Sequence, residues 1–362
     1  MKRLSVGWRS RALGVLLAIA GGFAASALGV PLAWVLGPMV ATALLSVMGM
    51  EVFAPIIGRR TGQIIIGATI GLHITVAVAA GIVPWLPLMF VVGALSVVVS
   101  AILAAILSWV ARISSETAYF GMLPGGLAEM ASIGADRGAD GEIITLCQAS
   151  RIALVVAITP PLIISLGIRG SVFDAASAHT IPYELVPVVL LVALIGVGAL
   201  RVIRFAAAWM VGALLAVGVA SAWGLFDGGM PNVVFFLGQY FIGLNIGSRF
   251  KRETVLRLPS LAWKIVIFHC LFITALFALA FAVSLLFSID LASAALALSP
   301  GGLAEMASTA QVLQLSTVLI TGFHVVRAII VNGFAMTFLR LVNKFSLFEL
   351  VARSLSAASG RK

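Results

Sequence analysis

Four charged residues lie within stretches of the chain that are otherwise apolar: Glu129, Arg151, Glu305 and Arg327. An ionisable side chain at the centre of a membrane helix costs about 2.5–3.5 kcal/mol on insertion scales, so such residues usually have a function or a partner. A carboxylate in this setting can coordinate a cation, relay a proton or contact a substrate, and it can also cap its own helix. Each arginine can pair with a glutamate or bind an anionic substrate.

These residues recur because the chain contains an internal repeat. The nonapeptide PGGLAEMAS occurs at residues 124–132 and again, 176 positions later, at 300–308. Self-similarity at a fixed offset is the signature of a duplicated architecture. The sequence therefore predicts two copies of one membrane unit, at residues 1–175 and 176–362.

The repeat also pairs polar residues in the apolar run that follows each nonapeptide. Arg151 matches Arg327, and Gln148, one helical turn before Arg151, matches His324. His324 can accept a proton near neutral pH. The alternative interpretation is a hydrogen bond from His324 to a neighbouring helix.

Each nonapeptide opens with a Pro-Gly-Gly sequence that predicts a break in an apolar helix. Proline removes a backbone donor, and two glycines add backbone freedom. In lipid, an unwound backbone is tolerated only inside protein or beside a water-filled cavity. The helix that starts after each break points free N–H groups at it, and such helix starts attract anions. The predicted break residues are Pro124, Gly125, Gly126, Pro300, Gly301 and Gly302.

Membrane helices must position these residues, because 62% of the chain is hydrophobic and 10% is charged, against about 25% charge in ordinary soluble domains. A membrane helix needs about 20 apolar residues. The long apolar runs are 12–29, 31–49, 61–80, 86–110 and 142–168, then 185–200, 204–222, 233–248, 262–288 and 314–339, and the broken runs are 118–134 and 291–310. We therefore predict an all-α polytopic membrane protein with two repeats, each of five transmembrane helices plus one broken re-entrant hairpin.

Basic residues indicate the orientation, since Lys and Arg gather in cytoplasmic loops. With the N-terminus inside, Arg169 is the one basic residue expected in an outside loop. Five crossings per half then give the second half the opposite orientation, with both termini cytoplasmic in a bacterial inner membrane. Inverted repeats with broken helices near the midplane are the plan of many secondary transporters.

The remaining polar and small residues suggest packing and cavity lining. In each half a Gly-Gln pair precedes two glycines four residues apart, which allow close helix contact within the chain or across a homodimer. The glutamines, Gln63 and Gln239, are candidates to line a cavity. The four histidines form no close pair suited to a redox metal, so we expect no metal, no cofactor and no enzymatic activity. The basic residues lie in short loops, so we expect no nucleic-acid partner.

The doubled PGGLAEMAS motif, the GQ-x3-G-x3-G element and the two-fold length resemble the bacterial AbrB-type membrane proteins. That family has a duplicated membrane module, and its members are also labelled ammonia monooxygenases or regulators. The resemblance covers nearly the whole chain and implies a fold more than a substrate. It does not extend to the small DNA-binding regulator that shares the name.

Taken together, the residues and the resemblance predict a secondary transporter of a small solute. The solute would bind where the two broken segments cross near the midplane, with an organic anion favoured and H⁺ or Na⁺ as a possible coupling ion. The alternative is an integral-membrane regulator or sensor that binds a small ligand without transporting it. In either case the expected partners are the lipid bilayer and a small molecule.

Overall fold

The computed structural model describes residues 8–30, 32–50, 52–165, 179–203, 205, 207–250, 252–253 and 259–359. Apart from one bridge between Thr180 and Gly229, these residues form helices and loops. The prediction of an all-α fold is therefore confirmed. Arg169, on which the orientation argument partly depends, lies outside the described residues.

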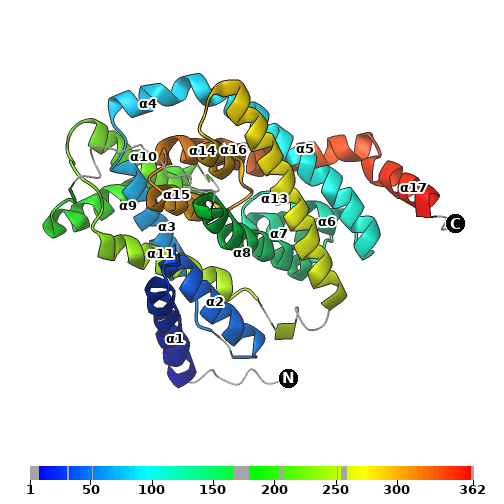
Figure 1. Cartoon of the computed structure of the whole chain (residues 1–362), viewed down its shortest axis with the longest axis horizontal. Coiled ribbons are helices and arrows are strands. Elements are labelled where there is room, and N and C mark those ends of the chain that lie inside the picture. Colours follow the sequence, from blue (N-terminus) through cyan, green and yellow to red (C-terminus); the bar gives the residue numbers. More distant parts are fainter. Residues whose placement is uncertain are drawn as a thin grey trace. The chain divides into compact units, whose positions relative to one another are not determined.

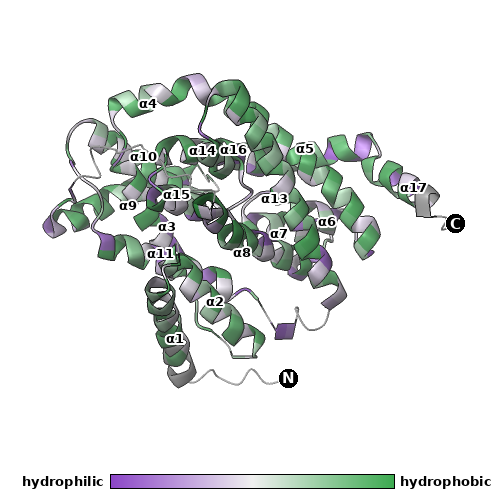
Figure 2. Ribbon diagram, in the orientation of Figure 1, coloured by the Kyte–Doolittle hydropathy of each residue, from purple (hydrophilic) through white to green (hydrophobic). Residues whose placement is uncertain are grey.

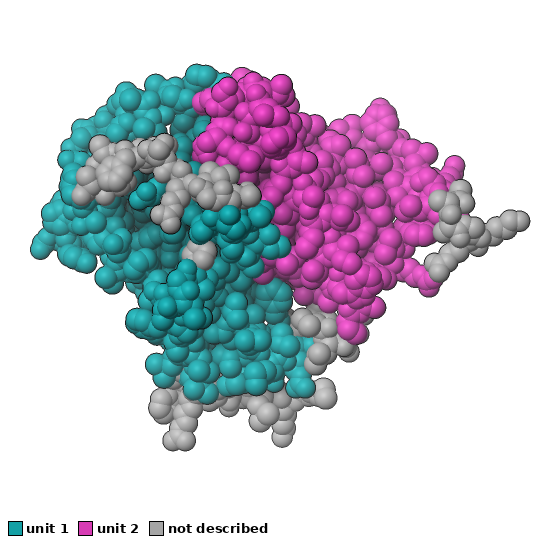
Figure 3. All heavy atoms as spheres, viewed as in Figure 1, with its two compact units in different colours: residues 1–84, 156–252, 302–321 teal, residues 85–155, 253–301, 322–362 magenta. Residues whose placement is uncertain are grey.

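The chain divides into two compact units, coloured separately in Figure 3. Unit 1 comprises residues 1–84, 156–252 and 302–321, and unit 2 comprises residues 85–155, 253–301 and 322–362. Each unit takes elements from both sequence halves. The compact units are thus different from the two predicted repeats, whose boundary near residue 175 stays a prediction.

Unit 1 is built around two helices, α3 and α11, that contact each other. In this unit α3 also packs against α9 and α10, while α11 packs against α1 and α2. The short helix α15 lies against both α3 and α11. The helices of unit 1 (Figure 1) are α1 (Trp8–Ala27), α2 (Ala33–Val47), α3 (Ile56–Gly71), α4 (Val76–Ile82), α9 (Val186–Val202), α10 (Ala208–Ala222), α11 (Asn232–Gly247) and α15 (Leu303–Val312).

Equivalent glycines of the two sequence halves make equivalent contacts in unit 1, each with a helix from the other half. Gly67 of α3 lies against Met210 of α10, and Gly243, its equivalent on α11, lies against Val35 of α2. A Cβ atom on either glycine would collide with the backbone carbonyl oxygen of that neighbour. Reciprocal contacts of this kind are the mark of two-fold symmetry. The predicted use of these glycines in packing within the chain is confirmed.

We expect Gly67→Leu to lower the free energy of unfolding by about 3 kcal/mol, the upper end for overpacking. The new side chain needs space that the Met210 carbonyl and the Ala213 side chain occupy. The measurement is the melting temperature in detergent, followed by tryptophan fluorescence. Gly198→Ala on α9 is the control, because no atom lies within 4 Å of a Cβ there, and it should not destabilise. Equal melting temperatures for the two variants would contradict the close contact of α3 with α10.

Unit 2 contains the long helices that flank the two breaks. α5 packs against α6, α13 and α17, while α13 packs against α14 and α6 against α7. Two helices are shared, since α8 passes into unit 1 after Val155 and α16 leaves it after Thr321. The helices are α5 (Leu86–Ala111), α6 (Ser115–Met122), α7 (Leu127–Ala135), α8 (Gly141–Ser165), α13 (Pro259–Phe287), α14 (Leu291–Leu298), α16 (Thr317–Lys344) and α17 (Leu347–Ser359).

Local sequence explains where the short helices before the breaks begin. Ser114 and Asp290, which are 176 residues apart, cap α6 and α14 by accepting from the N–H groups of Thr117 (3.2 Å) and Ser293 (2.8 Å). Serine and aspartate are favoured N-cap residues because their short side chains satisfy a free helix donor. The two predicted broken runs are thus each observed as a pair of short helices, α6 with α7 and α14 with α15.

Five of the described helices are long and apolar enough to cross a membrane by themselves, which is fewer than the ten full spans expected. They are Val76–Ala111, Gly141–Ser165, Tyr183–Val202, Pro259–Phe287 and Thr317–Lys344. The first of these runs through α4 and α5, which a short 3-10 turn at Val83–Trp85 connects. The helices around the centre of unit 1 are shorter, and α2, with 15 residues, is about 23 Å long. The hydrocarbon core is about 30 Å thick, so such a helix covers only part of it.

The predicted run 61–80 is two helices rather than one. α3 begins earlier, at Ile56, and ends at Gly71, and α4 begins at Val76. Thr75 causes the second start, because its side chain accepts from the N–H of Val78 at 3.2 Å. A strong N-cap residue within an apolar run therefore marks a boundary that hydropathy alone does not show.

Apolar residues make up most of the helices in both units (Figure 2). On α13, large apolar side chains such as Trp263, Leu271, Phe281 and Leu285 are exposed. A soluble protein rarely exposes so continuous an apolar surface. The chain is therefore a polytopic helical membrane protein.

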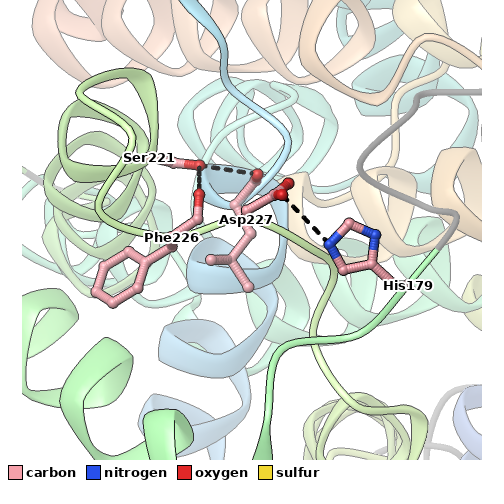
Figure 4. Close-up of polar contacts among 5 residues, drawn as sticks. His179, Ser221, Phe226 and Asp227 are labelled. Carbon is pink, nitrogen blue, oxygen red and sulfur yellow. Dashed lines mark hydrogen bonds and ion pairs between the residues drawn. The ribbon is translucent and has the colours of Figure 1, made fainter.

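A loop contact sets the start of α9. The segment before α9 pairs with the loop between α10 and α11, since the Gly229 N–H donates to the His179 carbonyl at 2.9 Å. In the same loops the side chains of His179 and Asp227 lie 3.4 Å apart, and Ser221, in the last turn of α10, donates to the Phe226 carbonyl (Figure 4). The His179 and Asp227 side chains are largely exposed, so this ion pair adds little stability.

Candidate functional site

The first break lies between α6 and α7, and two buried side chains of α8 hold it. Arg151 donates to the carbonyl oxygens of Leu123 (2.9 Å) and Gly125 (3.2 Å). Gln148, one turn earlier, donates through Nε2 to the carbonyl oxygens of Phe120 and Leu123, both at 2.8 Å. The side chains of α8 thus satisfy the carbonyl groups at the end of α6.

Proline explains why the break needs these donors. In a continuous helix the carbonyl of Phe120 would accept from the N–H of residue 124, but Pro124 has no N–H. Gln148 supplies the missing donor. Arg151 satisfies carbonyls beyond the helix end, where its charge also favours the negative end of the helix dipole. Left unpaired in apolar surroundings, these carbonyls would destabilise the fold.

The second break is held in the same way by α16. Arg327 donates to the carbonyl oxygens of Ser299 (2.6 Å) and Gly301 (2.7 Å). His324 Nε2 lies 2.9 Å from the carbonyl oxygen of Leu296, the group that the second proline leaves without a helical donor. Each bond joins residues 28 or 26 positions apart, as in the first half.

The protonation of His324 follows from its neighbour. Nη2 of Arg327 lies 2.9 Å from Nδ1 of His324, and a guanidinium can only donate. Nδ1 therefore accepts, and the protonated Nε2 donates a hydrogen bond to the carbonyl oxygen of Leu296. Because both ring nitrogens are used in holding the break, the geometry favours the hydrogen-bonding role of His324 over that of a proton acceptor.

We expect His324→Gln to retain most of the stability, since Gln148 makes the equivalent bond in the first half. His324→Leu should lose about 1–3 kcal/mol, because it leaves the buried Leu296 carbonyl with only the longer 3.3 Å bond from the Ser299 N–H. Melting temperatures in detergent compare the two variants with the unchanged protein. If the glutamine and leucine variants have the same melting temperature, His324 does not replace the donor that proline removes.

Glu129 lies at the position from which a capping box would reach back to Gly126. Its carboxylate covers that glycine, because a Cβ atom on Gly126 would collide with Oε2. The Gly126 N–H instead lies 3.4 Å from Oδ1 of Asn332, its acceptor. Oε2 of Glu129 is buried and has no hydrogen-bond partner among the described residues. The capping box, which was the alternative to a functional role of Glu129, is therefore not formed in the first half.

The pairing of arginine with glutamate, one of the two alternatives that the sequence left open for each arginine, is not observed in the first half. Among the described residues no ion pair joins Arg151 to Glu129. The guanidinium faces backbone carbonyls because they lie at the end of α6, where a positive charge is favoured. The helix break leaves backbone carbonyl groups without a helical donor, and these groups compete with the Glu129 carboxylate for Arg151. Sequence patterns give no sign of such carbonyl groups.

Unit 2 brings most of the predicted site residues together. Arg151 and Arg327 are both buried in this unit, and Asn332 of α16 contacts the first break. The predicted residues in unit 2 are Pro124, Gly125, Gly126, Glu129, Arg151, Pro300, Gly301, His324 and Arg327, and those in unit 1 are Gly302, Glu305, Gln63 and Gln239.

In unit 1, α15 carries a polar face formed by the buried Glu305 and Ser308 and the half-buried Gln311. Gln239 of α11 donates to Oγ of Ser308 at 2.7 Å. Nε2 of Gln311 lies 3.4 Å from Nε2 of His73, beyond the end of α3. Sequence reasoning did not select Ser308 or Gln311, although Ser308 belongs to the repeated nonapeptide and could have been found there.

The two candidate glutamines flank the crossing of α3 with α11. At this crossing a Cβ atom on Gly62 would lie 2.8 Å from the carbonyl oxygen of Gly238. Gln239 is buried. Gln63 is half-buried and makes no side-chain hydrogen bond within the described ranges. The Gly-Gln repeat therefore places both amides at one helix crossing, and only Gln239 is used there.

Comparisons with known proteins give a family and two relatives. A family profile described as "Transition state regulatory protein AbrB" matches residues 34–343. The chain is 28% identical over 358 residues to "Uncharacterized protein YhjN" of Bacillus subtilis (strain 168), covering 91% of this chain and 92% of that protein. It is 27% identical over 326 residues to "Putative regulator AbrB" of Escherichia coli (strain K12), covering 84% and 91%.

Proposed function

We propose that this chain, which belongs to the AbrB family, is a secondary transporter that moves a small solute across the membrane by alternating access. An organic anion is the favoured solute. The observation that carries the proposal is the pair of helix breaks. In each break an arginine at the equivalent repeat position donates to the equivalent backbone carbonyl groups. Broken helices in duplicated halves are where secondary transporters bind solutes and coupling ions.

The contents of unit 2 support an anionic solute. Arg151 and Arg327 are two buried guanidinium groups of the same unit, and an anion beside either of them would balance its charge. The helix that follows the first break, α7, carries Glu129 in its first turn, and the carboxylate of Glu129 covers the helix start. In the proposed cycle the solute carboxylate and the Glu129 carboxylate repel each other at this helix start. Protonation of Glu129, or binding of a cation by Glu129, therefore favours solute binding.

Unequal residues at equivalent positions support opposite orientations of the two halves. Trp209 of α10 has Arg60 at 4.6 Å and Arg201 at 5.1 Å from its ring centre. Its equivalent, Trp34 of α2, has instead Phe23 at 5.0 Å and Phe236 at 6.0 Å. Tryptophan marks both membrane interfaces, whereas arginine gathers on the cytoplasmic one. An inverted repeat therefore explains why one tryptophan has cationic neighbours and the other aromatic ones.

The experiment that tests this proposal begins with ligand screening. Purified protein in detergent is heated with a panel of small metabolites, organic anions first, and a ligand at 100 times its Kd should add about 2.7 kcal/mol of stability. Each ligand found is then tested for uptake into proteoliposomes under an imposed H⁺ or Na⁺ gradient. Uptake above that of protein-free liposomes supports transport, and binding without any flux under either gradient contradicts it.

One observation favours a second candidate, a membrane regulator that senses a ligand. The Escherichia coli relative is named "Putative regulator AbrB". A sensor would use the same polar groups to bind its ligand, but it would not release the ligand on the other side. Counterflow in proteoliposomes separates the two functions, because only a transporter exchanges labelled external ligand for unlabelled internal ligand.

A further inference from the structure

Two arginines of unit 1 share one indole ring. Arg60 comes from the first turns of α3, Arg201 from the last turn of α9, and Trp209 from the first turn of α10. Their Cζ atoms lie 4.6 Å and 5.1 Å from the ring centre of Trp209. Three helix ends that pack together thus present two guanidinium groups and one indole at one level of the unit.

The guanidinium groups of Arg60 and Arg201 place two positive charges close together, and an anion would neutralise them. The two distances to the indole place the guanidinium groups within about 10 Å of each other, about one Debye length at ordinary ionic strength. In the part of the chain that the structure describes, neither group has a carboxylate partner. The indole stabilises each cation through its ring face, but it does not neutralise the charge. A phosphate group, which guanidinium binds through paired hydrogen bonds, would neutralise it.

Apolar surface lies directly beside these charges. Val202 and Ile203, the two residues after Arg201, are 83% and 68% exposed. A water-soluble anion gains nothing from such a surface, whereas a phospholipid has a phosphate for the arginines and an acyl chain for the aliphatic residues. An arginine and tryptophan cluster at helix ends is also the composition of a membrane interface.

We propose that Arg60, Trp209 and Arg201 form a binding site for the phosphate headgroup of an anionic phospholipid, whose acyl chain lies along Val202 and Ile203. The equivalent position in the first half does not form such a site, since Phe236 occupies the position of Arg60 and stacks on Trp34 at 6.0 Å. The site thus belongs to one membrane leaflet. It does not depend on solute transport.

The test measures lipid binding to delipidated full-length protein in detergent. Dissociation constants for phosphatidylglycerol and phosphatidylcholine with the same acyl chains are obtained from native mass spectra. We expect tighter binding of phosphatidylglycerol, and about fivefold weaker binding in each of Arg60→Gln and Arg201→Gln, the loss for one basic residue at an interface. Arg59→Gln is the matched control, because it removes the same charge from the neighbouring residue of α3, for which no contact with the indole is found among the described residues.

Three results would overturn the proposal: equal affinity for the two lipids, equal affinities in Arg60→Gln and Arg59→Gln, or displacement of phosphatidylglycerol by an equal concentration of inorganic phosphate. The last would mean that the site binds free phosphate. The proposal can also be tested without variants, in case these do not fold, by measuring how the affinity of the unchanged protein for each lipid depends on salt. Its affinity for phosphatidylglycerol should fall as NaCl rises, whereas its affinity for phosphatidylcholine should not, and salt-independent binding would also contradict the proposal.

Discussion

Arg327→Met should destabilise the protein by about 3 kcal/mol or more, because it takes a charged donor away from several buried acceptors at once. The guanidinium holds the carbonyl oxygens of Ser299 and Gly301 and also donates to His324. Methionine fills similar volume but donates nothing. Removing the cost of burying a charge offsets part of the loss, yet three groups lose their donor together.

The melting temperature in detergent measures this effect, with Arg340→Met as the matched control. Arg340 lies on the same helix, α16, and is exposed, so its loss should be close to neutral. Arg327→Lys should fall between the two, because a single ammonium group can reach one carbonyl but lacks the planar fork that reaches both. If Arg327→Met and Arg340→Met have the same melting temperature, Arg327 does not hold the second break.

Arg151→Met extends the same expectation to the first break, where the arginine holds Leu123 and Gly125. The first break keeps a second donor to Leu123 from Gln148. We therefore expect a smaller loss for Arg151→Met than for Arg327→Met. The reverse order would show that hydrogen bonds to the break do not determine the stability of the two halves.

Glu129→Gln should reduce solute uptake by about 100-fold or more, if the carboxylate transfers a proton during the cycle, and should leave the melting temperature nearly unchanged. Glutamine has the same shape and no charge. Stability should survive because Oε2 of Glu129 makes no hydrogen bond among the described residues. Most substitutions of buried charged residues damage folding and function together, so a variant that loses only uptake isolates the chemical role.

Uptake into proteoliposomes is measured for Glu129→Gln and, as a control, for Glu349→Gln, which removes an exposed carboxylate from α17. The control should transport at the normal rate. Glu305→Gln tests the equivalent position in the second half, at the start of α15. Normal uptake by both Glu129→Gln and Glu305→Gln would remove the two glutamates from the proposed mechanism.

The sequence by itself predicted the features that depend on local backbone chemistry. Proline followed by two glycines interrupts a helix wherever it occurs, so the breaks at Pro124 and Pro300 and the short helices on either side could be inferred before any fold was known. The offset of 176 residues also paired Gln148 with His324 and Arg151 with Arg327. Helix ends were predicted less well where a cap such as Thr75 divides an apolar run.

Only the tertiary structure decided what the paired side chains contact. Nothing in the residue types of Gln148 and His324 suggests a shared role, yet each donates to the carbonyl that a proline leaves unpaired. Arg151 faces backbone oxygens where an ion pair with Glu129 was the simpler expectation. The physical reason is that backbone carbonyl groups are present at every residue and leave no signal in the sequence, whereas the need to satisfy them in an apolar interior is absolute enough to determine where buried donors point.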